Sequence, residues 1–414
     1  MGLTEPADGG ADSGMWEIDG RVRHYAWGSR SHLPELLDVP EDGSPWAEFW
    51  LGAHPLAPSR LSDGTGVGEL VASDPHAILG EGVARAFHDE LPFLLKVIAP
   101  ERPLSLQVHP SRARARESFA AEEAAGLPLD SPQRNYRDRN HKPELLVALS
   151  PFTALCGFRT PRRATAILEG LGTRLTDRLH ALLVENPTAH GMRAALRSLL
   201  SQSLRPDPGA VREVVAACDA RARGGASPSV RIDRIVAELG MHHPGDPGAV
   251  AAMLLNPVSM QPGEAMYVPP GALHAYISGV GIEVAAASDN VLRAGLTEKR
   301  VDVEELLQCV SVSAAPPVRI APERQSATTV AYYAPVDDFE VSFTTLDDGE
   351  AAGTGPHRVA GNGPRILLAL EGGMTVAAGG DERTLVPGRA LLVPASAGEL
   401  SVRGRGRMVQ ASVP

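Results

Sequence analysis

Long apolar runs are absent from this sequence. No stretch of about 18 uninterrupted apolar residues occurs, and the first residues, MGLTEPADGGADSG, are acidic and polar where a secretory leader would be basic and then apolar. We therefore expect neither a membrane protein nor an exported one, and we predict a cytoplasmic location.

Cysteine is also scarce, and the chain has no excess of positive charge. The cysteines, Cys156, Cys218 and Cys309, are far apart and form no C-x-x-C pair, which disfavours both a disulfide framework and a thiolate zinc site. We interpret them as small buried apolar residues. The net charge of -11 argues against nucleic-acid binding, which needs clustered cations. An anionic small substrate would therefore need a local basic pocket.

Lysine is rarer still. Among 39 basic residues only Lys96, Lys142 and Lys299 are lysines, so arginine supplies almost every generic positive charge. Lysine is a compact point charge that can lose its proton, whereas the planar arginine fork cannot. We infer that these lysines occupy positions where arginine would not serve.

The length and the turn-forming residues predict several mainly β units. A chain of 414 residues exceeds one usual core, and 42 Gly with 35 Pro in no fixed period favour short strands and many turns. The clearest strand candidates are 92–99, 104–109 and 145–149. We predict a disordered N-terminus over 1–14, a catalytic β unit over 15–160 and 258–315, a helical domain over 161–257 where apolar residues recur at helical spacing, and a C-terminal non-catalytic β unit over 316–414.

An internal repeat supports the two β units. Gly263, Pro269 and His274 share a frame with Gly388, Pro394 and Glu399: glycine, five residues, proline, four residues, then a polar side chain. Two copies of one β architecture explain this match. Because glutamate replaces histidine in the second copy, we expect that copy to hold no metal.

Four residues form a candidate metal site. Gln107 and His109 stand two apart at the end of a predicted strand, so their side chains share a face. Pro143 restricts the residue before it to extended geometry, which fixes the direction of Glu144 at the start of the next strand. His274 follows a Pro-Pro-Gly turn. This set of nitrogen and oxygen ligands suits a divalent ion such as Zn²⁺ and leaves a position for water or substrate.

The sequence resembles a known family at these same places. Glycine, five residues, proline, four residues, histidine matches the second signature of the cupin β-barrel, and Gln-x-His with a distant Glu is similar to a variant of the first. Longer segments resemble type I mannose-6-phosphate isomerases in the family's order, over most of residues 20 to 310: YAWGS, PWAEFWLGAHPLAPS, LPFLLKVIAPERPLSLQVHP, NYRDRNHKPELLVAL and GVGIEVAAASDNVLRAGLTEKRVDV.

The resemblance implies a zinc enzyme with a catalytic cupin, a helical domain and a second, non-catalytic cupin. It implies one zinc per chain, held by Gln107, His109, Glu144 and His274, and it makes Arg293 the active-site arginine. It also implies an aldose–ketose isomerase acting on mannose 6-phosphate and fructose 6-phosphate, in sugar catabolism or in the supply of GDP-mannose. We expect a monomer.

An isomerisation of this type moves a proton between C2 and C1 through an enediolate. For the proton shuttle the sequence offers Lys142, Glu283 and His141, and does not choose among them. Arg293 is a candidate for the enediolate or the phosphate. Further candidates are Lys299 and Ser105 for the phosphate, Asp289 as an orienting residue, Tyr276 for substrate contact, and Lys96 as either a supporting cation or an edge residue.

Three alternatives stay open. An iron-dependent oxygenase on a cupin would have a His-rich site and no phosphate pocket, and the glutamine ligand with Arg293 and Lys299 speaks against it. A catalytically inactive sugar-sensing cupin would be missing ligands, whereas the full set is present. An isomerase for another 6-phosphosugar differs only in the shape of the pocket.

Overall fold

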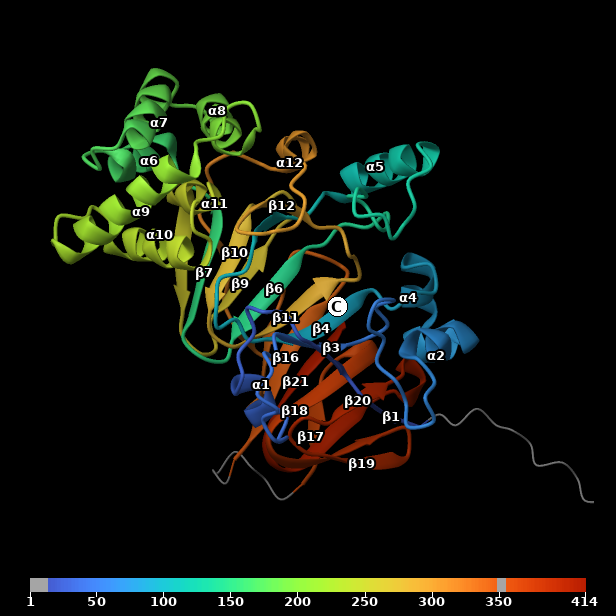
Figure 1. Ribbon diagram of the computed structural model, residues 1–414. Coiled ribbons are helices and arrows are strands. Elements are labelled where there is room, and N and C mark those ends of the chain that lie inside the picture. The colour runs from blue at the N-terminus through green and yellow to red at the C-terminus, as the bar shows by residue number, and fades with distance from the viewer. Residues whose placement is uncertain (1–13, 348–354) are drawn as a thin grey trace, which may run out of the picture.

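The computed structural model of the chain describes residues 14–347 and 355–414. The predicted disordered N-terminus therefore lies almost wholly outside the described residues. Three sheets form the body of the molecule, helices α6 to α11 gather at one end, and the C-terminal sheet lies at the other (Figure 1). The predicted class, mainly β with a helical insertion, is confirmed. None of the described helices is long and apolar enough to cross a bilayer.

Two of the sheets carry the predicted metal ligands. The five-stranded sheet has the order β12-β5-β10-β7-β8, and the seven-stranded sheet has the order β13-β9-β6-β11-β4-β3-β2. The first contains β5 (Leu106–Val108), β7 (Phe152–Phe158), β8 (Leu255–Met260), β10 (His274–Ser278) and β12 (Leu292–Gly295). The second contains β2 (Arg21–Arg23), β3 (Glu48–Leu51), β4 (Phe93–Ile98), β6 (Glu144–Ala148), β9 (Ala265–Val268), β11 (Gly281–Ala286) and β13 (Val318–Ile320).

The third sheet holds most of the C-terminal unit. It is nine-stranded, with the path β1-β20-β18-β21-β16-β15-β14, while β17 pairs with β21 and β19 with β18. Its strands are β1 (Trp16–Ile18), β14 (Glu323–Arg324), β15 (Thr329–Tyr332), β16 (Glu340–Leu346), β17 (His357–Val359), β18 (Asn362–Ala378), β19 (Asp381–Leu385), β20 (Ala390–Val393) and β21 (Leu400–Val413).

The helices fall into two groups. Six helices and one 3-10 turn make the helical domain: α6 (Pro161–Leu168), α7 (Arg174–Glu185), α8 (Ala189–Leu200), α9 (Pro208–Arg223), α10 (Val230–His242), α11 (Gly248–Ala251) and η1 (Ala252–Leu254). The others lie beside the sheets: α1 (His32–Leu36), α2 (Val67–Ser73), α3 (Pro75–Leu79), α4 (Glu81–Ala86), α5 (Arg112–Ala124), α12 (Val303–Cys309) and η2 (Ala395–Ala397).

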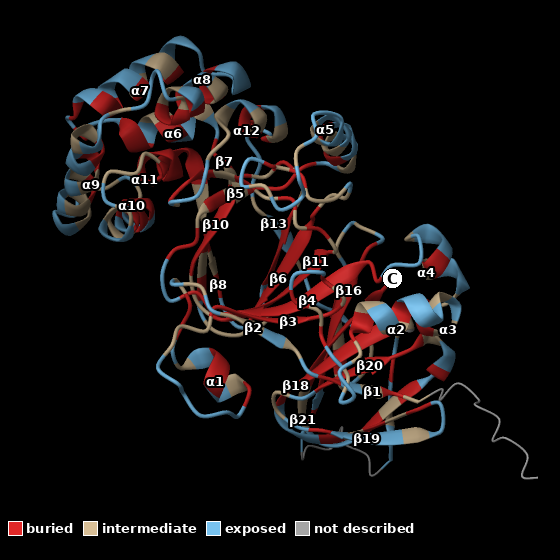
Figure 2. Cartoon of the chain, turned by 45° about the vertical axis from the view of Figure 1, so that its right-hand side comes forward, coloured by how far each residue is buried: buried red, intermediate tan, exposed pale blue. Residues whose placement is uncertain are grey.

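Alternation along the strands gives each sheet two apolar faces. One face of the five-stranded sheet packs on the helical domain through residues such as Val108, Ile277 and Leu292. One face of the seven-stranded sheet packs on the nine-stranded sheet and α2 to α4. The two inner faces meet in a separate cluster that includes Leu146 and Met266. Figure 2 shows these strands almost continuously buried. Any polar side chain on an inner face is therefore enclosed between the two sheets.

Two predicted boundaries need correction at their ends. β1 precedes the rest of the first unit in sequence, yet it pairs with β20 of the C-terminal sheet. Conversely, β13 was assigned to the C-terminal unit but pairs with β9 of the seven-stranded sheet. Both strands are only three residues long. Their sheet is decided by pairing with segments that are distant in sequence, and the local sequence pattern does not indicate such pairing.

Helix α5 lies where strands and turns were expected. Its sequence, RARARESFAAEEA, buries only Ala115 and Ser118 within the helix. Ser111 caps the first turn through its side chain, which accepts from the backbone N–H of Arg114. Because the helix has almost no apolar stripe, periodicity did not reveal it.

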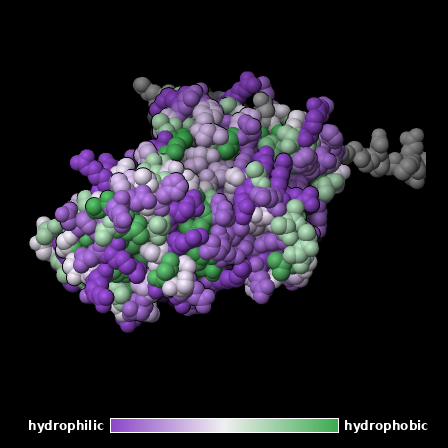
Figure 3. Space-filling model, turned by 90° about the horizontal axis from the view of Figure 1, so that it is seen from above, coloured by the Kyte–Doolittle hydropathy of each residue, from purple (hydrophilic) through white to green (hydrophobic). Residues whose placement is uncertain are grey.

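The internal repeat has a structural counterpart. β9 and β20 begin at the same offset from Gly263 and Gly388, and each is followed by a turn and a new strand. Where His274 enters the sheet interior, Glu399 is exposed and pairs with Arg358 at 2.6 Å. The outer surface of the molecule in Figure 3 is largely hydrophilic, with apolar side chains only in small scattered groups.

Candidate metal centre and active site

Three predicted ligands meet between the two inner sheet faces. His109 Nε2 lies 3.1 Å from Glu144 Oε1, and His274 Nε2 lies 3.3 Å from Glu144 Oε2. The ligand atoms of all three are within 4.8 Å of one another, and all three side chains are buried. The β10 and β5 register places His274 directly opposite Gln107, which brings the fourth predicted ligand to the same point.

The two imidazoles are oriented by backbone carbonyls. His109 Nδ1 lies 2.8 Å from the carbonyl oxygen of Asn290, and His274 Nδ1 lies 3.0 Å from that of Ala272. A nitrogen facing a carbonyl must be the protonated one, so each Nε2 carries a lone pair. Neither Nε2 has a hydrogen-bond partner among the described residues.

These residues fit a divalent metal ion. Two lone pairs and a carboxylate face one another in a buried space, an arrangement that is unfavourable unless a cation lies among them. Burial lowers the pKa of His109, which favours the neutral form that a metal needs. Burial would raise the pKa of Glu144, but His109 and Lys142 bring it well below its usual value, so the carboxylate is ionised. The mixed nitrogen and oxygen set suits zinc.

The metal site opens into a cavity of about 580 Å³. The alternation of β3, β4, β5, β10, β11 and β12 points polar side chains inward at every second position. The lining includes Glu48, Trp50, Lys96, Ser105, Gln107, Lys142, Glu144, Tyr276, Glu283, Asp289, Arg293 and Lys299. Eleven of the twelve predicted site residues lie at this cavity or in its metal trio: nine line the cavity, and His109 and His274 belong to the trio. Lys96 also lines the cavity.

A buried charge cluster forms one wall of the cavity. Lys96 Nζ lies 2.7 Å from Glu283 Oε1, with side-chain exposures of 5% and 3%. Glu48 lies close to both: burial raises its pKa, Lys96 opposes this, and Trp50 Nε1 donates to its Oε2 at 2.6 Å. Lys96 is therefore a supporting cation and not a sheet-edge residue, which settles the choice left open by the sequence.

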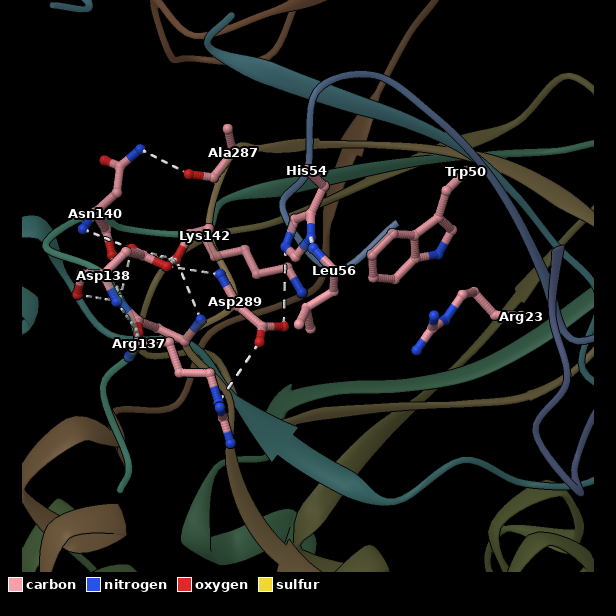
Figure 4. Close-up of polar contacts among 12 residues, drawn as sticks. Arg23, Trp50, His54, Leu56, Arg137, Asp138, Asn140, Lys142, Ala287 and Asp289 are labelled. Atoms are coloured by element: carbon pink, nitrogen blue, oxygen red, sulfur yellow. Dashed lines mark hydrogen bonds and ion pairs between the residues drawn. The ribbon is translucent and has the colours of Figure 1, made fainter. Parts of the chain in front are cut away.

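A loop clasp holds the ligand-bearing segments together. Asn290 Nδ2 donates to the carbonyl oxygens of Asp138 and Asn140, while its own carbonyl oxygen faces His109. Asp138 accepts hydrogen bonds from Ser288 and from the backbone of Asp289. Figure 4 shows Asp138, Asn140 and Asp289 of this network beside Lys142. One asparagine thus links three segments that are distant in sequence and orients a predicted metal ligand.

Comparison with known proteins identifies the family of the chain. Residues 15–161 match the family described as phosphomannose isomerase type I, catalytic domain. The mannose-6-phosphate isomerase of Escherichia coli (strain K12) is 36% identical over 403 residues, which cover 96% of this chain and 99% of that protein. The chain belongs to the mannose-6-phosphate isomerase family. The predicted family and enzyme class are thereby confirmed.

Other members of the family extend the likeness. Mannose-6-phosphate isomerase 2 of Arabidopsis thaliana is 30% identical over 416 residues, covering 94% of this chain and 90% of that protein. The mannose 6-phosphate isomerase of Salmonella typhimurium, solved with its substrate F6P and zinc, has a TM-score of 0.85 at 32% identity. That comparison covers 96% of this chain and 99% of the solved one.

Two cations also line the cavity. Arg293 pairs with Gln107 across β12 and β5, which places it one strand from the metal ligands. Burial lowers the pKa of Arg293. Burial, and then the nearby Arg293, lower the pKa of Lys299, whose Nζ lies 6.0 Å from the ring of Tyr25. Two partly desolvated cations side by side favour an anionic group between them.

One predicted candidate is not brought to the cavity. His141 is absent from the lining, and its Nε2 instead lies 3.0 Å from Asp338 Oδ1 and 2.7 Å from a terminal nitrogen of Arg112. His141 lies in the loop before β6, and its contacts to Asp338 and Arg112 turn it away from the cavity that Lys142 lines. A direct proton transfer by His141 is therefore inconsistent with this geometry.

Two lining residues were missed by sequence reasoning. Glu48 and His54 both lie in the PWAEFWLGAHP segment, which was matched to the family without assigning roles. His54 Nε2 lies 4.0 Å from Asp289 Oδ1, and burial lowers the pKa of His54 to about 4 even though Asp289 opposes that shift. Figure 4 shows His54 and Asp289 facing each other across the cavity mouth. The sequence signal that could have identified both residues is an ionisable side chain within an otherwise mainly apolar segment.

Proposed function

We propose that this protein interconverts mannose 6-phosphate and fructose 6-phosphate with one bound zinc ion. The observation that carries the proposal is the buried trio of His109, Glu144 and His274, whose imidazole Nε2 atoms have no hydrogen-bond partner among the described residues, beside a cavity that Arg293 and Lys299 also line. A sugar phosphate offers oxygens to the trio and an anion to the two cations. The family of the chain supports the same substrate pair.

The metal would be held by the trio together with Gln107. When bound, zinc supplies positive charge that polarises a carbonyl and offsets negative charge developing on substrate oxygens. Asn290 and Ala272 keep the two imidazoles in the required tautomer through their backbone carbonyls. The chain thus provides an orienting shell as well as ligands.

The phosphate would be bound by Arg293 and Lys299. Arg293 offers a planar fork of donors and Lys299 a point charge, a combination suited to a phosphate dianion. With the phosphate held there, the sugar chain extends toward β5 and β10, where Ser105 and Tyr276 line the cavity. The two faces of the sandwich exclude bulk water from the reacting carbons.

We assign the proton shuttle between C2 and C1 to Lys142. Its Nζ lies 3.5 Å from Glu144 Oε1, so it stands beside the metal ligands and lines the cavity. Glu283, the rival candidate, is engaged by Lys96 at 2.7 Å and belongs to the buried charge cluster. Lys142 would take the C2 proton and return it at C1 while an enediolate is the intermediate.

A coupled assay tests this function. Formation of fructose 6-phosphate from mannose 6-phosphate is followed before chelation, after chelation, and after zinc is restored. Activity that disappears and then returns supports both the reaction and the cofactor. Purified protein that contains zinc but produces no fructose 6-phosphate would contradict the substrate assignment. A Lys142→Arg variant with full turnover would contradict the assignment of the shuttle.

We also propose that the sheets are cupin barrels. The five- and seven-stranded sheets share one enclosed cluster, and the nine-stranded sheet encloses a second. The repeated glycine, proline and strand frame in β9 and β20 supports a common origin of the two units.

A further inference from the structure

The C-terminal unit sends one buried acidic side chain to the catalytic unit. Asp338 lies two residues before the start of β16, and its side chain is only 3% exposed. Both carboxylate oxygens lie close to His141 Nε2, at 3.0 and 3.1 Å, and Oδ1 also accepts from Arg112 at 3.1 Å. A buried carboxylate with two such partners is fixed in place.

The residue that Asp338 holds opens the ligand-bearing segment. His141 directly precedes Lys142 and lies three positions before Glu144. The backbone N–H of His141 donates to the Asn140 side chain at 3.0 Å. Pro143 has no N–H, so the next main-chain attachment is its carbonyl oxygen, which accepts from Ala286 at 3.1 Å. Between those two attachments, the His141 side chain contacts Asp338 and Arg112.

Arg112 does not replace Asp338 as an anchor. Its side chain is 40% exposed and lies in the first turn of α5, and its cation sits 2.7 Å from the same His141 nitrogen. A guanidinium N–H can donate to a neutral imidazole nitrogen, but Arg112 is partly exposed and itself donates to the buried Asp338 carboxylate. Asp338 is therefore the buried group that contacts both His141 and Arg112.

The C-terminal unit is held firmly enough to act as a fixed support. The seven- and nine-stranded sheets share one buried cluster, with Tyr267 and Val147 on one side and Val341 and Val409 on the other. A second attachment between the sheets is the Tyr332 hydroxyl, which donates to the carbonyl oxygen of Gly263 at 2.7 Å.

We propose that Asp338 is a positioning residue for the active site, acting through His141 to hold Lys142 and Glu144. The C-terminal unit, which contributes no side chain from β14 to β21 to the cavity lining described above, would thereby complete the catalytic unit. Only the kinetic part of the test rests on the proposed function. The placement of Glu144 can also be measured as zinc affinity, which does not depend on the substrate.

The experiment compares three single variants with the wild type. Asp338→Ala removes the anchor, Asp338→Asn keeps an acceptor oxygen, and Tyr332→Phe removes the other attachment between the sheets without approaching His141. For each, zinc affinity is measured by competition with a chromophoric chelator, melting temperature is measured on the metal-free protein, and kcat and KM are measured with mannose 6-phosphate.

We expect Asp338→Ala to lose about 10- to 100-fold in zinc affinity or kcat, the range found for residues that orient metal ligands. KM should change much less, because Arg293 and Lys299 are untouched. Asp338→Asn should recover part of the loss, and Tyr332→Phe should stay within about twofold of wild type in both quantities. A His141→Ala, Asp338→Ala double variant should be no worse than His141→Ala alone, as expected for residues that act in series.

Two results would overturn the proposal. One is wild-type zinc affinity and kcat in Asp338→Ala. The other is an equal loss in Tyr332→Phe, which would mean that docking of the unit, and not this carboxylate, is what matters. If the wild-type protein were inactive on mannose 6-phosphate, the proposed function would fail, while the zinc competition would still decide the role of Asp338.

Discussion

Replacing Lys96 by methionine tests the buried charge cluster. Methionine keeps much of the side-chain volume and removes the ammonium group. In the native protein that group lies 2.7 Å from Glu283 and 5.2 Å from the centre of the Trp50 ring. Burial alone would lower the pKa of Lys96, but Glu283 and Glu48 raise it instead. The variant leaves two carboxylates in one enclosed space without their cation.

The expected loss of stability follows from the burial of the pair. Removing one partner of a buried ion pair costs about 3–5 kcal/mol. Unfolding entropy of about 2.1 cal/mol/K per residue amounts to about 0.9 kcal/mol/K for this chain of 414 residues. We therefore expect the melting temperature of Lys96→Met to fall by about 3–6 °C at pH 8.

The loss of melting temperature in Lys96→Met should depend on pH in a defined direction. Burial already raises the pKa of Glu48, and without Lys96 nothing opposes that shift as strongly, so the pKa of Glu48 in the folded state rises further above the unfolded value of about 4.3. A carboxylate with a raised folded pKa contributes stability at low pH and loses it as the pH rises through that pKa. The difference between variant and wild type should therefore shrink as the pH is lowered from 8 toward 5.

The measurement is calorimetric melting of metal-loaded proteins. The matched control is Arg403→Met, which removes an ion pair whose partners are about half exposed, and which should shift the melting temperature by under about 1 °C. A Lys96→Met, Glu283→Leu double variant should lose less than the sum of the single changes. The reasoning would be refuted if Lys96→Met melted within 1 °C of wild type, or if its deficit were the same at every pH.

Three further outcomes are expected from the site. His274→Ala should lose stoichiometric zinc, and added zinc should no longer raise its melting temperature; retained zinc would remove His274 from the ligand set. Arg293→Ala should raise KM for mannose 6-phosphate by at least 10-fold at unchanged zinc content, whereas an unchanged KM would place the phosphate elsewhere. Glu48→Gln should raise the melting temperature increasingly above pH 5, because burial raises the pKa of Glu48 and its ionised form is disfavoured; a fall at pH 8 would show that Lys96 stabilises the carboxylate.

Two strands of the site were predictable because they combine two local signals. β4 (Phe93–Ile98), which carries Lys96, and β6 (Glu144–Ala148), which begins with Glu144, lie within one residue of the predicted bounds. Each is a short apolar run between Pro, Gly and polar residues, and each carries a charged residue that must face inward. The period of two also predicted that Gln107 and His109 share a face, while Glu144 comes from the other inner sheet.

The parts of the fold and the site that the sequence did not predict depend on contacts between distant segments. The contact of β1 with β20 joins residues 16 and 392, and no local pattern marks it. Likewise, the direction of His141 was unreadable because the segment 138–143 is a loop held by Asn290 and by Asp338 rather than by strand alternation. Sequence spacing therefore succeeded where a strand fixed the side-chain direction and failed where a remote side chain did.

All three sheets contribute to holding the residues of the proposed metal site. The inner faces of the five- and seven-stranded sheets supply the ligands, but a strand end is held only as well as the loops that enter it. His109 is oriented by the Asn290 clasp, and His274 by its own turn. On the N-terminal side of Glu144, the Pro143 carbonyl is attached to Ala286, and the His141 side chain contacts Asp338, which lies just before β16 of the nine-stranded sheet. A sheet that lies outside the cavity therefore has a physical route to the metal geometry, through one buried carboxylate.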